Sequence, residues 1–87
     1  MGSYWISRSC SHGEITWQMK EVAKGEYIVH IVDRPYRRQF GVKICSIGDG
    51  IFHVTKTNED GIQIDEGHMS KDKSFEDKDG YRYTYRE

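Results

Sequence analysis

The chain has 87 residues, of which 36% are hydrophobic and 13% aromatic, and its formal net charge is −1. This length predicts a single domain over residues 1–87 with a small hydrophobic core. The apolar content is too high for a disordered chain. The balanced charge argues against a protein that binds nucleic acid through a general excess of basic residues.

The charge is distributed unevenly along the chain. Residues 1–45 contain seven Lys or Arg and four Asp or Glu, a balance of +3, whereas residues 46–87 contain six and ten, a balance of −4. Either the two halves neutralise each other in the folded protein, or they form separate surfaces for an acidic and a basic partner.

Cys10 and Cys45 are too few for a scaffold held together by disulfides, and the sequence leaves open whether they pair. No apolar run has the length of a signal peptide core or of a membrane span. We therefore expect a cytoplasmic protein that makes no membrane contact.

In chain order, residues 3–7 predict a short first strand, and residues 14–24 fit two alternatives. Ser11 and Glu14 have the spacing of a helix capping box, with apolar residues at helical spacing after them. The stretch ITWQM, however, alternates apolar and polar residues as a strand does, and a glycine precedes it. We favour a strand over 14–20, and a short helix near 14–24 remains the alternative.

The middle of the chain has the clearest strand signals. Runs rich in β-branched residues predict strands at 26–33, 39–47, 51–57 and 61–65, and strict alternation predicts a last strand at 81–86. The first of these runs is almost continuously apolar, which is typical of a central strand. The fold class is therefore mainly β, a small antiparallel meander or barrel of about five or six strands.

The composition becomes polar and mixed in charge after Gly67. Such a composition is typical of a solvated loop, so we predict that residues 68–79 form a mobile polar segment.

The hairpin around Gly48-Asp49-Gly50 sets which residues face each other. A three-residue loop would pair Cys45 with His53. That register also places five large apolar residues on one face, which predicts a wall of the core made by Phe40, Val42, Ile44, Phe52 and Val54.

A thiol beside an imidazole is the minimum of a cysteine nucleophile. No third orienting residue accompanies Cys45 and His53, so we predict no catalytic residue, although an enzyme is not excluded. The spacing of histidines, cysteines and acids fits neither a zinc site nor a calcium loop, and no metal or cofactor is predicted. His30, inside an apolar run, is interpreted as a hydrogen-bonded structural histidine.

The densest group of cationic and aromatic residues lies in the loop DRPYRRQF, and we call Arg34, Tyr36, Arg37 and Arg38 the basic–aromatic loop. Aromatic rings and arginines bind unpaired bases and phosphates, but they are also enriched at protein–protein hot spots. A solvated turn is the third alternative. Because the net charge is not basic, we favour a protein partner over nucleic acid.

The last strand places Tyr81, Tyr83 and Tyr85 on one face. This face either covers the core or contacts a partner, and an edge position would also allow the strand to accept one from a partner. The predicted binding residues are these tyrosines and the basic–aromatic loop.

Together these features predict a small binding module, such as a regulator or inhibitor that occupies a partner protein's surface. The alternative is a nucleic-acid-binding module or, less favoured, a small ribonuclease that would use His30, His53, Arg37 and Arg38. The sequence indicates neither the partner's identity nor the oligomeric state.

Overall fold

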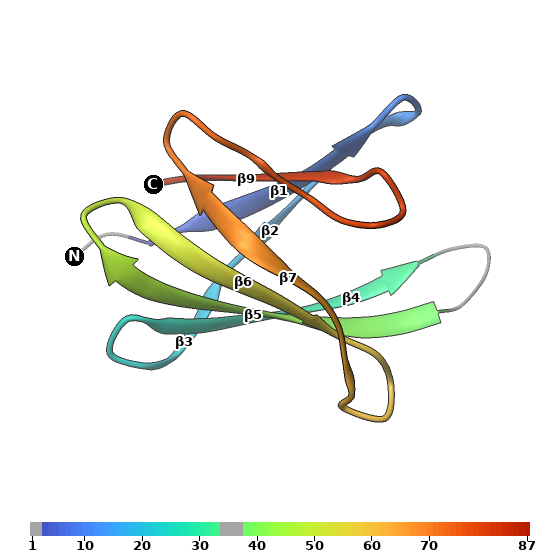
Figure 1. The fold of residues 1–87 in the computed structure, drawn as a ribbon, viewed down its shortest axis with the longest axis horizontal. Helices are drawn as coiled ribbons and strands as arrows, with labels where there is room; N and C mark the ends of the chain where they lie inside the picture. The colour runs from blue at the N-terminus through green and yellow to red at the C-terminus, as the bar shows by residue number, and fades with distance from the viewer. Residues whose placement is uncertain (1–2, 34–37) are drawn as a thin grey trace.

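The computed structural model describes residues 3–33 and 38–87, and this part of the chain contains strands and no helix (Figure 1). Every strand pairing is antiparallel. The nine strands are β1 (Trp5–Cys10), β2 (Gly13–Gln18), β3 (Lys20–Ala23), β4 (Glu26–Asp33), β5 (Arg38–Gly48), β6 (Ile51–Thr57), β7 (Gln63–Ser70), β8 (Phe75–Glu76) and β9 (Arg82–Arg86). The prediction of a mainly β meander is confirmed.

The strands form two sheets that pack around one core. One sheet has four strands in the order β2-β1-β9-β8, and the other has five in the order β3-β4-β5-β6-β7. The larger sheet is a meander in which each strand pairs with the next one in sequence, whereas in the smaller sheet β9 returns to lie between β1 and β8. Figure 1 shows the β1–β2 hairpin and the end of β4 separating from each other on one side of the molecule.

The chain passes from one sheet to the other at Met19. The Met19 amide still donates to the carbonyl of Tyr4 at 2.9 Å, whereas the next residue, Lys20, already pairs with Ile28 of β4. The Met19 side chain is buried, which anchors the bend in the core. The segment 14–24 is therefore two strands and not a helix, because residues 13–18 pair with β1 and residues 20–23 pair with β4.

Beyond this bend, β2 and β4 part. The β3–β4 pairing extends on β4 only from Glu26 to Ile28, so the rest of β4 has a neighbour, β5, on one side only. Val29 and Ile31 face the core, whereas Ile28 and Val32 are exposed. β4 lies between β3 and β5, in line with the prediction of a central strand, but only one of its faces packs on the core.

The predicted core wall is confirmed, since all five of its residues are buried. Cys45 pairs with His53 as predicted. The turn differs, however: Gly48 pairs with Ile51, and a bulge at Ile47 absorbs one residue. Ile47 is exposed, so the bulge moves it away from the core while the rest of the register is kept.

At one end of the core, aromatic rings close the space between the sheets. Tyr4, Tyr27, Phe52 and Tyr85 make edge-on contacts, with ring centroids 4.7 to 6.3 Å apart. The Tyr85 hydroxyl also donates to the carbonyl of Gly50 at 2.7 Å. Aromatic rings therefore fill the space between the sheets at this end of the molecule.

The segment 68–79, predicted as a mobile polar loop, contains the end of β7 and the whole of β8. Three of its side chains, Met69, Phe75 and Asp77, are buried. Ser70 and Lys73 close the connection with hydrogen bonds between their backbones. The mobility of this segment stays a prediction. Its mixed charges are typical of a loop, but some of its residues belong to the core.

Candidate functional site: the Arg8 groove

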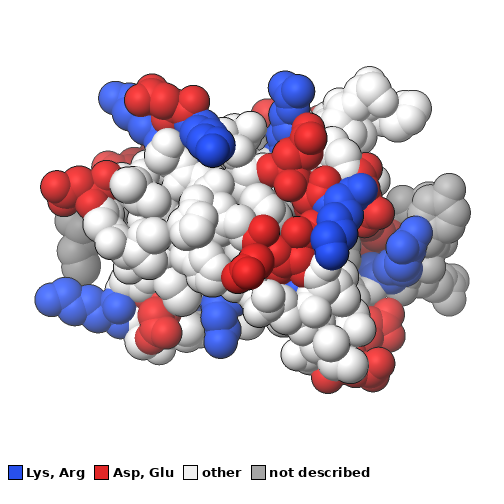
Figure 2. All heavy atoms as spheres, in the orientation of Figure 1, with Lys and Arg blue, Asp and Glu red and all other residues white. Residues whose placement is uncertain are grey.

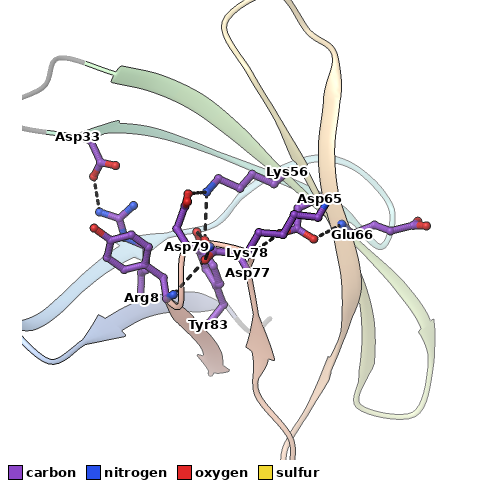
Figure 3. A network of polar contacts seen from close by, with 10 residues as sticks. Arg8, Asp33, Lys56, Asp65, Glu66, Asp77, Lys78, Asp79 and Tyr83 are labelled. Atoms are coloured by element: carbon purple, nitrogen blue, oxygen red, sulfur yellow. Dashed lines mark hydrogen bonds and ion pairs between the residues drawn. The ribbon is translucent and has the colours of Figure 1, made fainter.

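The end of the core opposite the aromatic cluster is polar. Arg8 of β1 faces inward and binds Asp33, the last residue of β4, with Nη2 and Oδ1 2.5 Å apart. Figure 3 shows these two side chains pointing at each other from different sheets. Arg8 is 6% exposed, so this ion pair lies almost entirely out of water.

Three aromatic rings surround the Arg8 guanidinium. Its Cζ atom lies 4.2 Å from the ring centroid of Tyr81, 5.5 Å from that of Phe40 and 5.6 Å from that of Trp17. Cations over ring faces at such distances are attracted by the ring quadrupole, more strongly when water is excluded. Asp33 and the rings therefore hold the guanidinium in one place.

One donor of this guanidinium is left over. Among the described residues, no hydrogen bond of suitable geometry reaches the buried Nη1 of Arg8, although the guanidinium also interacts with the Tyr83 hydroxyl. A buried donor without an acceptor costs about 1–3 kcal/mol, and native proteins rarely leave one unexplained. An acceptor brought by another molecule would remove this cost.

A groove of about 590 Å³ opens beside Arg8, in the space where β2 and β4 part. Its lining combines the hairpin that ends β1 and begins β2 with the end of β4 and with Tyr81: Arg8, Cys10, His12, Gly13, Glu14, Ile15, Val32, Asp33 and Tyr81. We call this space the Arg8 groove.

Ile15 is one of two exposed apolar residues in the groove lining, the other being Val32. Ile15 pairs with Arg8 across β1 and β2, and paired residues lie on the same face of a sheet. Ile15 therefore projects from the inner face, yet it is 54% exposed. The interior of the domain is open at this point.

A second polar cluster, centred on Asp77, lies next to the groove at the same end of the core. Asp77 accepts hydrogen bonds from the Tyr83 hydroxyl at 2.8 Å, from Lys56 Nζ at 3.1 Å, and from the amides of Asp79 and Tyr81 (Figure 3). The side chain of Asp77 is fully buried. The charge of Lys56 is also close to Asp79, at 3.5 Å, and to the Phe40 ring.

These contacts shift two pKa values in opposite directions. Burial alone would raise the pKa of Asp77, but the hydrogen bonds from Tyr83, the Tyr81 amide and Lys56 outweigh it and lower the pKa below its ordinary value. Burial, together with the adjacent Asp77 carboxylate, raises the pKa of Tyr83. Tyr83 therefore stays a neutral donor and Asp77 a charged acceptor.

The lowered pKa of Asp77 predicts a loss of stability in acid. Because its carboxyl is harder to protonate in the folded protein, Asp77 stabilises the fold fully well above pH 3.8, its ordinary pKa. That contribution is lost as the pH falls below 3.8 through the folded-state pKa. Urea unfolding followed by tryptophan fluorescence between pH 3 and 7 measures this. In the variant Asp77→Asn, the free energy of unfolding should fall less steeply as the pH is lowered. An unchanged slope would show that Asp77 is not the group responsible.

The structure describes one residue of the basic–aromatic loop, Arg38, and places it with Tyr81 in the lining of a second pocket. Arg34, Tyr36 and Arg37 lie outside the described residues. Arg38 begins β5, is exposed and pairs with Asp33 in the strand ladder. The basic–aromatic loop therefore stays a prediction, with only its last residue placed.

Tyr83 and Tyr85 lie on the inner face of β9, and Tyr81 directly precedes this strand. Tyr83 is completely buried, and Tyr81 and Tyr85 are half-buried against the core. β9 pairs with β1 from Arg82 to Arg86 but with β8 only at Arg82 and Tyr83, so within the described residues the other edge of its last three residues has no strand partner. The two alternatives for this face were that it covers the core or that it contacts a partner. Tyr83 covers the core, and of the three tyrosines only Tyr81 lines the groove.

Cys45 and His53 are neighbours on the outer face of the larger sheet. His53 Nε2 lies 3.2 Å from Glu66 Oε2, and its ring lies 5.2 Å from that of His68. Both cysteines are free thiols. Among residues 3–33 and 38–87, no three His, Cys, Asp or Glu side chains converge as a metal site would require. His30 is hydrogen-bonded to Gln39, as predicted, but it is exposed.

Sequence reasoning missed Arg8, Asp33 and Ile15. A signal for Arg8 was present, since strand alternation places it on the same face as Ile6. A charged residue on an apolar face needs a partner, but the partner, Asp33, is 25 positions away in the chain.

Comparisons with protein-family models, with curated proteins and with solved structures found no match to this chain. The described part of the chain also contains no helix long and apolar enough to cross a membrane. The function must therefore be argued from the groove itself.

Proposed function

We propose that this protein is a binding module for another protein, and that the partner is bound in the Arg8 groove. The observation that carries the proposal is the buried Nη1 of Arg8, a donor without an acceptor among the described residues, at the wall of an open groove. A small regulator or inhibitor that acts by occupying its partner's surface fits a domain of this size.

The chemistry of the groove supports a protein rather than nucleic acid. Glu14 and Asp33 flank Arg8 in the lining, so the groove has no excess of positive charge to hold phosphates. Ile15, Val32 and Tyr81 offer apolar and aromatic surface for side chains. Figure 2 shows charges of both signs intermixed around an uncharged centre on the face in view, without a basic stripe.

The proposal predicts that a charge at position 15 abolishes binding. Immobilised wild-type protein should capture a protein partner from a lysate of its own source cells, and nuclease treatment should leave that capture unchanged. Ile15 is 54% exposed. The variant Ile15→Glu should reduce capture about tenfold or more, because it puts a charge on the surface from which the bound partner excludes water. The matched control Val22→Glu, 59% exposed on β3 and outside the groove lining, should bind as the wild type does.

Two results would contradict the proposal. Capture that disappears on nuclease treatment would favour the alternative, a nucleic-acid-binding module. Equal capture by the variants Ile15→Glu and Val22→Glu, both shown to be folded by circular dichroism, would exclude the groove as the binding site.

A further inference from the structure

Within residues 3–33 and 38–87, the groove is bordered by backbone that has no strand partner. β2 is the last strand of its sheet, so one of its edges is free along residues 13–18. Across the groove, β4 lacks a neighbour on the same side from Val29 to Asp33. Free strand edges present rows of unpaired N–H and C=O groups, which accept an additional strand readily.

The ladder between β1 and β2 shows which groups of β2 are free. Met19 donates its amide to Tyr4 on the β1 side. In an antiparallel pair, alternate residues point their backbone groups toward the partner strand and the others point them away. By this alternation, the amides and carbonyls of Glu14, Thr16 and Gln18 face the free edge.

We infer that the partner binds as an added β-strand: an uncharged, extended segment that runs antiparallel to β2 along this free edge. One of its apolar side chains covers Ile15, and one of its backbone carbonyls accepts the hydrogen bond from Arg8 Nη1. This inference rests on the proposed function and names the kind of segment that the groove takes.

A neutral acceptor suits Arg8 better than a carboxylate does. The charge of Arg8 is already balanced by Asp33 at 2.5 Å, and Glu14 also lines the groove. A carboxylate of the partner would lie close to these two acids and be repelled by them. A peptide carbonyl satisfies the donor without adding charge, and an extended peptide supplies carbonyls at regular intervals.

The test uses the full chain and a library of random ten-residue peptides displayed on phage. Peptides selected on the wild type are synthesised and titrated against the variants Glu14→Ala, Glu14→Pro and Ile15→Glu. Glu14→Ala removes the carboxylate but keeps the edge amide, so it is the reference with which Glu14→Pro is compared. Glu14→Pro removes that amide while leaving the bonds to β1, and should weaken binding about tenfold. In the wild type, bound peptide should slow hydrogen exchange at the Glu14, Thr16 and Gln18 amides.

Each other outcome overturns strand addition. Peptides that bind Glu14→Pro and Glu14→Ala equally well, but not Ile15→Glu, would reject it while the proposed function stands. Acidic peptides whose affinity does not depend on the edge amide would also reject it, in favour of a carboxylate bound to Arg8. If no peptide binds above the Ile15→Glu background, or if peptide leaves the exchange of the three amides unchanged, strand addition is rejected, and the lysate capture alone decides the proposed function. If Glu14→Pro is unfolded, the exchange measurement decides.

Discussion

Replacing Asp77 by Asn should lower the free energy of unfolding by about 3–5 kcal/mol, the cost typical of removing one partner of a buried ion pair. Lys56 is buried and lies 3.1 Å from the lost charge, and its remaining acid, Asp79, is farther away at 3.5 Å. The Asn amide would also present N–H groups where the Tyr83 hydroxyl and Lys56 donate. A domain of this size has only about 4–13 kcal/mol of stability in total, so the effect is a large part of it.

Urea unfolding followed by circular dichroism at pH 7 measures this change. The matched control is Asp79→Asn. The Asp79 side chain is 62% exposed, so this change should lower the free energy of unfolding by less than about 1 kcal/mol. The double variant Lys56→Met/Asp77→Asn should be more stable than Asp77→Asn alone, because the unpaired buried charge is gone. Equal losses for Asp77→Asn and Asp79→Asn would show that the buried pair does not hold this end of the fold.

Replacing Gly67 by Ala should lower the free energy of unfolding by about 1–3 kcal/mol, through overpacking of the core. Gly67 lies opposite the buried Val54 in the β6–β7 pair, so its missing side chain faces the interior. The Phe75 ring fills that space: a Cβ atom at position 67 would lie 2.4 Å from Phe75 Cδ1. The ring is itself buried and cannot move aside without disturbing the core.

Thermal and urea unfolding of Gly67→Ala test this. Gly48→Ala is the matched control, because a Cβ there meets no atom within 4 Å, and its cost should be a few tenths of a kcal/mol at most. Adding Phe75→Leu to Gly67→Ala should cost less than the sum of the two single changes, since the smaller side chain relieves the clash. A Gly67→Ala variant as stable as the wild type would mean that Phe75 does not lie over this glycine.

The strand pattern and one wall of the core could be predicted from the sequence. Alternation of period two placed Phe40, Val42 and Ile44 on one face, and a register that kept large apolar residues together paired Cys45 with His53. Both follow from local pattern, because burying one face of a sheet allows a single choice of register. The length of the turn was not predictable in this way, since a bulge at Ile47 restores the same register.

The candidate site depended on tertiary structure. Sequence analysis selected residues by type, so arginines and tyrosines in the most conspicuous stretches were chosen, and Arg8 was not. Tyr81 and Tyr83 are two positions apart and alternate alike, yet one lines the groove and the other is completely buried. Local pattern gives the face of a strand, but not what covers that face.

Local sequence pattern was enough to predict the mainly β fold, the strand positions from Glu26 to Thr57 and the shared face of the tyrosines near the C-terminus, because these depend on near neighbours in the chain. Three features depended on the tertiary structure: the passage of the chain from one sheet to the other at Met19, the ion pair of Arg8 with Asp33, and the burial of Asp77 with Lys56 among several similar acids. These contacts join residues 21 or more positions apart. The energies of these contacts depend on which polar groups are buried together in the folded protein. A local sequence pattern does not contain that information.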